Sequence, residues 1–175
     1  MKATGIVRRI DELGRIVIPK EIRRTMRIRE GDPLEIYTDR DGEVIFKKYS
    51  PIGELTTFAA QYAEAMSRAC GCGVLVTDRD AVVAVAGGSK KELLERRLSE
   101  EYEQFLERRR LFAAEGGAKP LLCVEGAEES AVRAAAPIIA EGDLIGSVAI
   151  LGGGKETGDE QLLQTAAGFL ARQME

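Results

Sequence analysis

The first 50 residues place the strongest limit on the fold, because turns divide them into very short segments. Apolar runs at 3–9 and 15–18 predict strands, and Asp41-Gly42 between two further runs is a strong hairpin signal. Four short strands and one short helix cannot bury enough apolar surface to be stable alone, and they leave sheet edges open. The sequence therefore predicts that this segment is dimeric and closes its edges on a second copy of the chain.

A helix is expected from about Lys20 to Met26, directly after Pro19, because proline is well tolerated in the first turn of a helix. Within it, Ile22 and Met26 are spaced to face inward. The following hairpin should have one apolar face, because hydrophobic and polar residues alternate along both of its strands. The residues expected on that face are Leu34, Ile36, Val44 and Phe46.

The net charge of −4 is unevenly distributed along the chain. Residues 1–29 contain nine Lys or Arg and three acidic residues, a charge of +6, so the other 146 residues carry −10. A basic head on an acidic body is typical of a protein in which one region meets a polyanion. The alternative is that Asp11, Glu12 and Glu21 neutralise arginines in structural ion pairs, but three acids cannot pair with nine bases.

The arginines of this head lie where they can reach a partner. Arg8 and Arg15 flank the first turn, and Arg23 and Arg24 project from the expected helix. Duplex DNA offers phosphates and a major groove wide enough for a helix or a β-ribbon. Arginine suits both targets, through bidentate contacts to phosphate and to guanine. We therefore expect double-stranded DNA as a partner.

Several classes of function are disfavoured by what the sequence lacks. It contains no His, the commonest general base and a common metal ligand, and we expect no catalytic residues, no metal and no cofactor. It has no apolar run of about 18 residues and no signal-like N-terminus, so we expect a cytoplasmic protein without a membrane segment. GGGKET at 152–157 lacks the spacing of a phosphate-binding loop and is expected to connect a strand to a helix.

The cysteines leave one enzymatic alternative open. Cys70, Cys72 and Cys123 form neither an even set nor a CxxC motif, and we interpret them as small apolar core residues. A thiol-dependent reductase would instead need one cysteine whose pKa is lowered by a helix N-terminus or an arginine.

The remainder of the chain predicts a second, α+β domain. Ser50-Pro51 is a helix-start signal, and apolar residues keep a three-or-four spacing through 51–69. This linking helix either lies only on the C-terminal domain or also packs on its symmetry mate and carries signals between domains. Five or six mainly antiparallel strands should follow, with a charged helix at 89–110 and a last helix opened by a capping box at 157–160.

Residues 4–49, and above all the motif DELGRIVIPKEIRR at 11–24, resemble the swapped-hairpin DNA-binding domain of the AbrB family of bacterial transition-state regulators. The resemblance implies a β-barrel of interleaved hairpins from two chains. It also assigns DNA binding to the arginines at matching positions, which are Arg8, Arg15, Arg23 and Arg24, with Arg9 beside them. The implied domains are 1–50 for DNA binding and 51–175 for the second domain.

The second domain resembles the GAF-like α/β sandwich with an antiparallel sheet that follows the AbrB-type head in a sporulation regulator. The resemblance implies a transcription factor associated with the nucleoid of the forespore, activating some genes and repressing others, and a tetramer through both domains. An unknown small-molecule ligand of the GAF domain is left open. Because related hairpin folds occur in toxin–antitoxin modules, an antitoxin-like protein is an alternative, although antitoxins usually carry a disordered tail rather than a folded domain.

Overall fold

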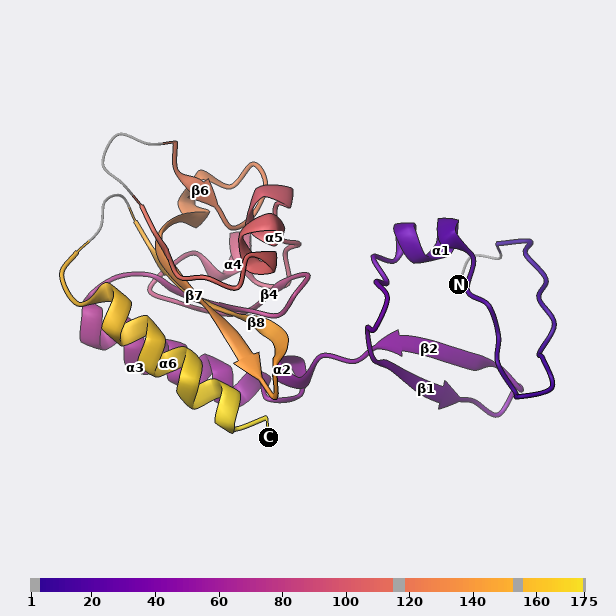
Figure 1. Cartoon of the computed structure of the whole chain (residues 1–175). Helices are drawn as coiled ribbons and strands as arrows, with labels where there is room; N and C mark the ends of the chain where they lie inside the picture. The colour runs from indigo at the N-terminus through magenta and orange to yellow at the C-terminus, as the bar shows by residue number, and fades with distance from the viewer. Residues whose placement is uncertain (1–3, 115–118, 153–155, 175) are drawn as a thin grey trace. The chain divides into compact units, whose positions relative to one another are not determined.

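In the computed structural model, which describes residues 4–114, 119–152 and 156–174, the chain divides between Tyr49 and Ser50 (Figure 1). The N-terminal unit is Met1–Tyr49 and the C-terminal unit is Ser50–Glu175. Each unit has its own sheet: two strands in the first and six in the second.

The N-terminal unit contains helix α1 (Lys20–Thr25) and the hairpin of β1 (Leu34–Thr38) and β2 (Val44–Lys48). The strands are antiparallel, with Ile36 opposite Phe46. The side chain of Asp39 organises the turn, because its Oδ1 accepts the backbone N–H groups of Asp41 (3.0 Å) and Glu43 (2.9 Å). The predicted helix and hairpin are therefore confirmed.

The two strands predicted at 3–9 and 15–18 are not formed within the single chain. Residues 4–9 and 15–18 belong to no helix or strand, and residue 3 lies outside the described residues. The turn between them is present, with Gly14 N–H donating to Asp11 O at 2.9 Å. A strand requires a hydrogen-bonded neighbour, and these segments have none among the described residues of one chain.

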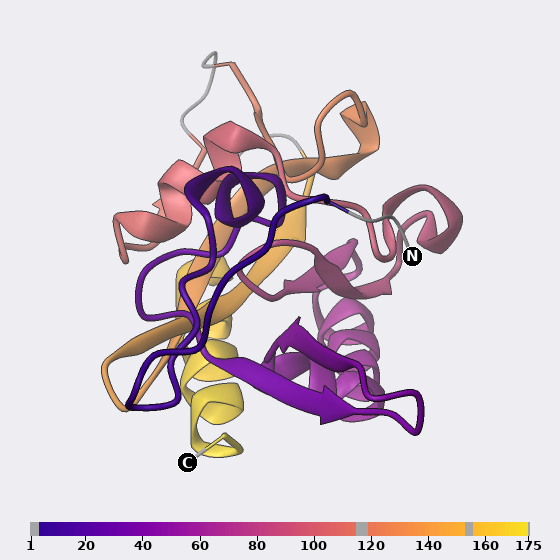
Figure 2. The same ribbon diagram turned by 90° about the vertical axis from the view of Figure 1, so that its right-hand side faces the viewer.

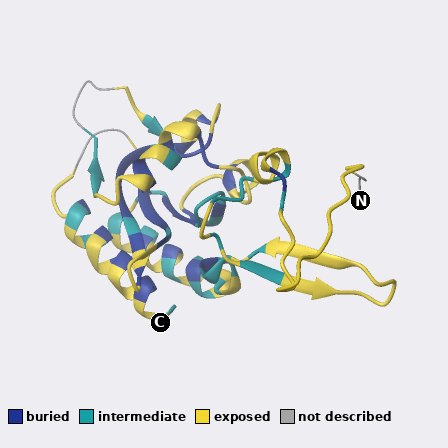
Figure 3. Cartoon of the chain, turned by 45° about the vertical axis from the view of Figure 1, so that its right-hand side comes forward, coloured by how far each residue is buried: buried dark blue, intermediate teal, exposed yellow. Residues whose placement is uncertain are grey.

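Little of the N-terminal unit is buried, as the yellow ribbon in Figure 3 shows. Pro19 is the only buried residue among the described residues of this unit, and Ile22 is half-buried. The inward position expected for Met26 is wrong, because this side chain is 57% exposed. The other large apolar side chains left exposed are Ile6, Val7, Ile10, Leu13, Ile16, Val17, Ile36, Tyr37, Val44, Ile45, Phe46 and Tyr49.

The C-terminal unit begins with α2 (Pro51–Glu54) and α3 (Thr56–Cys70), at the place predicted for one helix. Ser50 is the N-cap of α2, and its Oγ accepts the N–H of Gly53 at 3.1 Å. Leu55 (φ −99°, ψ 27°) separates the two helices. Ile52 anchors α2 because it is fully buried in the core.

A six-stranded antiparallel sheet forms the centre of this unit. Its strands are β3 (Val74–Thr77), β4 (Val82–Ala86), β5 (Phe112–Ala113), β6 (Leu121–Leu122), β7 (Ala131–Ala140) and β8 (Asp143–Leu151). They are ordered β4-β3-β8-β7-β5, and β6 also pairs with β7. A short 3₁₀ turn, η1 (Glu128–Ser130), precedes β7. The predicted antiparallel sheet is confirmed.

Helices cover both faces of the sheet (Figures 1 and 2). Helices α3 and α6 (Asp159–Arg172) lie on one face, and α4 (Lys90–Leu93) and α5 (Glu100–Glu107) lie on the other. The strands alternate accordingly, since Val74 and Val76 pack towards α3 and α6 whereas Leu75 packs towards α4 and α5. Hence both faces of the sheet are apolar, and the core has two layers.

The charged stretch at 89–110 is not one helix as predicted. It divides into α4 and α5, and between them Leu98 bridges to Val124. Glu95 has a positive φ of 61°, which interrupts the helix. Ser99 caps α5 by accepting the N–H of Tyr102 at 3.1 Å, whereas Ser89, the N-cap residue of α4, makes no side-chain cap hydrogen bond.

The last helix also starts differently from the predicted capping box at 157–160. Its N-cap is Gly158 (φ 97°), and its first residue, Asp159, is 4% exposed. The Asp159 carboxylate binds the buried guanidinium of Arg133 on β7 at 3.0 and 2.9 Å. A buried ion pair therefore holds the start of α6. Residues 153–155, within the loop predicted at 152–157, lie outside the described residues.

Candidate nucleic-acid interface

The turn from Asp11 to Arg15 is built around one carboxylate. Asp11 Oδ1 accepts the N–H groups of Leu13 (3.0 Å) and Arg15 (2.8 Å), and Oδ2 accepts from Arg15 Nε at 2.8 Å. The backbone N–H of Arg15, followed by its guanidinium, holds the pKa of Asp11 below its usual value. This arrangement fixes the backbone between the two flanking basic segments.

The alternative of structural ion pairing holds for one arginine of the predicted set. Arg15 pairs with Asp11, and its side chain nevertheless remains 71% exposed. Within residues 4–114, 119–152 and 156–174, Glu12 and Glu21 form no ion pair. Among the described residues, neutralisation by acids therefore concerns one of the five arginines predicted to bind DNA.

The other arginines predicted to bind DNA point into solvent. Arg8 and Arg9 lie on the extended segment before the turn, and Arg23 and Arg24 lie in the last turn of α1; all four are exposed. Among the described residues, none of these four forms an ion pair. Each is therefore available to a polyanion without first breaking an internal ion pair.

A polar cluster that the sequence patterns did not single out supports the loop after α1. Asp32 Oδ2 accepts the N–H of Arg29 at 2.8 Å and lies 3.4 Å from Lys48 Nζ. Lys48 Nζ also donates to the carbonyl of Arg27 at 2.9 Å. The Asp32 side chain is 3% exposed. This cluster connects the backbone after α1 to strand β2. In the sequence, only the turn-forming pair Gly31-Asp32 indicated a local structure here.

The surroundings of Cys72 and Cys123 disfavour a reactive thiolate. Cys123 is buried in the core, and burial raises the pKa of its thiol well above the usual value. Burial, reinforced by the neighbouring Cys70 thiol, raises the pKa of Cys72 to about 12. A nucleophilic cysteine requires the opposite shift. These surroundings agree with the interpretation of the cysteines as packing residues.

Within the described ranges, no group of three or more Cys, Asp or Glu side chains is placed to bind a metal ion. None of the described helices has the length and hydropathy required to cross a membrane.

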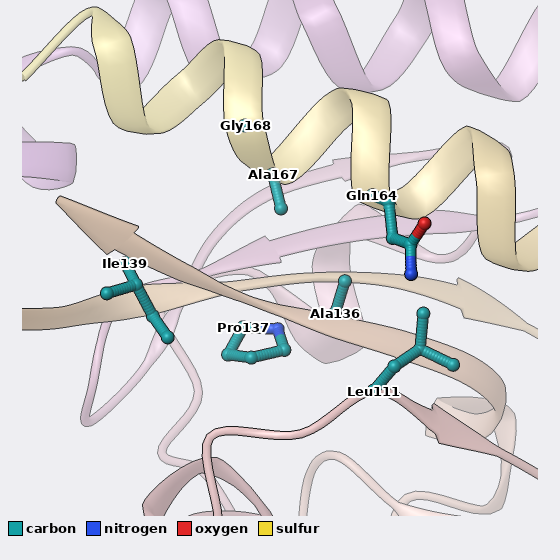
Figure 4. Close-up of a pocket in the computed structure, with 7 residues that line it drawn as sticks. All are labelled: Leu111, Ala136, Pro137, Ile139, Gln164, Ala167 and Gly168. Carbon is teal, nitrogen blue, oxygen red and sulfur yellow. The ribbon is translucent and has the colours of Figure 1, made fainter. Parts of the chain in front are cut away.

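A groove lies between α6 and β7 in the C-terminal unit (Figure 4). Its volume is about 270 Å³. It is mainly apolar, and the amide of Gln164 is a polar group on its wall. The lining residues are Leu111, Ala136, Pro137, Ile139, Gln164, Ala167 and Gly168.

Comparison with known proteins defines the class of this protein. Residues 7–53 match the family model for antidote-toxin recognition MazE, a bacterial antitoxin. The head is also 65% identical over 51 residues to the transition state regulatory protein AbrB of Bacillus subtilis (strain 168), covering 29% of this chain and 52% of that protein. The chain is thus a DNA-binding regulator with an AbrB-type N-terminal domain.

The particular family follows from the rest of the chain. Residues 54–175 match the model for the C-terminal part of stage V sporulation protein T, a transcription factor. Over 178 aligned residues the chain is 54% identical to stage V sporulation protein T of Bacillus subtilis (strain 168), covering 100% of this chain and 99% of that protein. The chain belongs to the stage V sporulation protein T family.

The GAF-like fold has support from a solved structure. The cofactor-binding GAF domain of the nutrient sensor CodY from Clostridium difficile superposes with a TM-score of 0.50 at 16% sequence identity. The match covers 66% of this chain and 83% of that chain. At this low sequence identity, the similarity shows the fold of the C-terminal unit and nothing more.

Proposed function

We propose that the DNA-binding surface of this sporulation regulator is formed by Arg8, Arg9, Arg15, Arg23 and Arg24 from two paired copies of residues 1–50. The observation that carries the proposal is the exposure of four of these arginines without ion pairs among the described residues. It is supported by the 65% identity of this segment to a transition state regulator. Residues 51–175 then form the GAF-like domain, which begins with helices α2 and α3 where one linking helix was expected.

Binding in this scheme is mainly electrostatic. Paired arginine surfaces release counterions from the DNA phosphates, which supplies much of the affinity and makes it depend steeply on salt. Sequence preference comes largely from the shape and deformability of the DNA, together with arginine contacts to base edges. The acidic remainder of the chain takes no part in these contacts.

The proposal also includes a cellular location and a direction of regulation. We propose a cytoplasmic, nucleoid-associated regulator in the forespore that activates some genes and represses others. No enzymatic activity is part of the proposal, since burial raises the pKa of Cys72 and Cys123. An antitoxin role fits less well, because the chain after residue 50 is a folded unit rather than a tail that could wrap a toxin.

Removing single arginines tests the proposed surface. We expect Arg15→Ala and Arg23→Ala each to weaken binding to promoter-length DNA and to lower the salt slope by about one for each phosphate that a protomer no longer binds. The measurement is a DNA titration by fluorescence anisotropy at several salt concentrations. Arg68→Ala is the matched control, because this exposed arginine lies on α3 of the C-terminal unit.

Two outcomes would contradict these expectations. If both variants keep the wild-type salt slope, Arg15 and Arg23 do not bind phosphates. If the folded wild-type protein fails to bind DNA at low salt, the head serves another partner.

We further propose that the C-terminal unit joins dimers into a tetramer through α3 and α6. Tyr62 of α3 and Phe169 of α6 stack with ring centroids 5.2 Å apart, and Phe58 lies 5.8 Å from Phe169. Phe169 is 41% exposed, so part of this aromatic cluster is available to a second copy. Exposed aromatic residues are typical of protein interfaces.

Charge placed on this cluster should separate the tetramer. We expect Phe169→Glu to sediment as a dimer under conditions in which the wild-type protein is a tetramer, because a carboxylate would have to be buried at the interface. Gln104→Glu is the control, since it adds the same charge to an exposed position of α5 on the other face of the sheet. A tetrameric Phe169→Glu protein would place the interface elsewhere.

A small-molecule ligand is a second candidate role for the C-terminal unit. The groove between α6 and β7 favours it, because apolar walls with a single amide suit a small, mainly apolar compound.

A further inference from the structure

The chain passes between its two units with almost no free segment. The backbone N–H of Tyr49, the last residue of the N-terminal unit, donates to the carbonyl of Pro33 at 3.0 Å. Ser50, the next residue, is already held within the C-terminal unit. The Tyr49–Ser50 peptide therefore joins a hydrogen-bonded residue of one unit directly to a hydrogen-bonded residue of the other.

The hydroxyl of Ser50 makes two hydrogen bonds at this point. Its Oγ accepts the N–H of Gly53 at 3.1 Å, which caps α2. It also donates to Oδ2 of Asp78, 28 residues further along the chain, at 3.0 Å. The cap alone would require only an acceptor, so the bond to Asp78 is an additional restraint on the first residue of the unit.

Asp78 is a firmly placed acceptor. Its other oxygen, Oδ1, accepts the N–H groups of Asp80 and Ala81, both at 2.7 Å, and its own N–H donates to Ala81 O at 3.0 Å. Strand β8 packs directly against its backbone, because a Cβ built on Gly146 would lie 2.9 Å from the Cα of Asp78. The Asp78 carboxylate is therefore fixed relative to the sheet, and its hydrogen bond restrains the Ser50 side chain at that position.

We propose that the Ser50–Asp78 hydrogen bond is a positioning element for DNA binding. By restraining Ser50 against the β3–β4 turn, it limits the orientations that the arginine-bearing unit can sample before DNA is bound. A restrained protein loses less conformational freedom on binding and so binds more tightly. The inference rests on the proposed DNA-binding function, and Ser50 and Asp78 are positioning residues that do not touch DNA.

Ser50→Ala tests the inference without changing the charge of the protein. It removes both hydrogen bonds of the Ser50 hydroxyl. We expect DNA binding to weaken roughly three- to tenfold. The salt slope should be unchanged, because every arginine still reaches its phosphate. Ser50→Thr retains the hydroxyl and should bind as the wild type does. Both are measured with the full-length protein by DNA titration at several salt concentrations, well below the melting temperature of each variant.

Ser99→Ala is a closely matched control. Ser99 also caps a helix, by accepting from Tyr102 N at 3.1 Å, and also donates to a distant carbonyl, that of Leu122, at 2.6 Å. Its side-chain hydrogen bonds go to Tyr102 and Leu122 and not to Ser50 or Asp78, so its loss should lower the melting temperature and leave DNA affinity unchanged.

The outcomes separate this inference from the proposed function. Weaker binding by Ser50→Ala alone, with rescue by Ser50→Thr, supports the positioning role. Equal affinity of Ser50→Ala and the wild type, or a lower salt slope in Ser50→Ala, overturns it. A wild-type protein that binds no DNA at low salt contradicts the proposed function itself.

Discussion

We expect Ile36→Asp to prevent pairing of the N-terminal units and to weaken DNA binding by about a hundredfold or more. Ile36 lies opposite Phe46 in the β1–β2 hairpin, and the two side chains are 62% and 41% exposed in the single chain. If this face is buried against a second copy, an aspartate there would be an unpaired buried charge, which costs about 3 kcal/mol or more. Sedimentation velocity and a DNA titration would measure the two effects.

Ile36→Val is the conservative counterpart of this change. It removes one methylene and keeps the apolar face, so it should pair and bind DNA almost as the wild type does. Normal assembly and normal DNA affinity of Ile36→Asp would mean that the exposed face of the hairpin is not the surface on which two copies meet.

Gly146→Ala should strongly destabilise the C-terminal unit. A Cβ at this position would lie 1.9 Å from the carbonyl oxygen of Thr77 and 2.9 Å from the Cα of Asp78. Both neighbours are backbone atoms in or next to β3, so the clash can be relieved only by moving strands apart. We expect a loss of about 3 kcal/mol in the free energy of unfolding, the upper part of the usual range for overpacking. Urea denaturation followed by circular dichroism would measure it.

A second glycine of the same unit serves as the control. Gly168 lies within α6, and no atom is within 4 Å of a Cβ built there. Because glycine is a poor helix former, Gly168→Ala should raise the free energy of unfolding by up to about 1 kcal/mol. If Gly146→Ala is as stable as Gly168→Ala, the close approach of β8 to β3 does not constrain residue 146.

Local patterns in the sequence predicted many of the elements. Helix α1, the β1–β2 hairpin and the antiparallel sheet of the second domain follow from turn residues and from apolar runs of the right length. Such signals depend on residues close together in the chain, and they need no knowledge of the final packing.

The predictions from the sequence were wrong where contacts between residues far apart in the chain determine the structure. The stretch at 89–110 has helical spacing, yet Leu98 pairs with Val124 and splits it. Asp159 begins α6 because it pairs with Arg133, which lies 26 residues earlier. The segments 3–9 and 15–18 have the composition of strands but find no neighbouring strand within the described part of one chain. A pattern of short range carries no information about any of these partners.

The candidate DNA-binding arginines show the same difference between what the local sequence indicates and what only the structure shows. Their presence and the excess of base over acid were visible in the sequence, and the structure adds which of them are paired. Arg15 lies beside Asp11, whereas the exposed Arg8 and Arg23 form no ion pair among the described residues. The support of the helix by Asp32 and Lys48 could not be predicted, because it joins residues on either side of the hairpin.

The unequal burial of the two units has a consequence for how the protein is made. The N-terminal unit leaves the ribosome first, yet Pro19 is the only buried residue among its described residues. The C-terminal unit, with its two-layered core, can fold from one chain. Because the proposed DNA-binding surface needs two paired heads, its formation is a bimolecular step whose rate rises with the rate of synthesis. The amount of active regulator should therefore increase more steeply than the amount of polypeptide when expression of the gene begins.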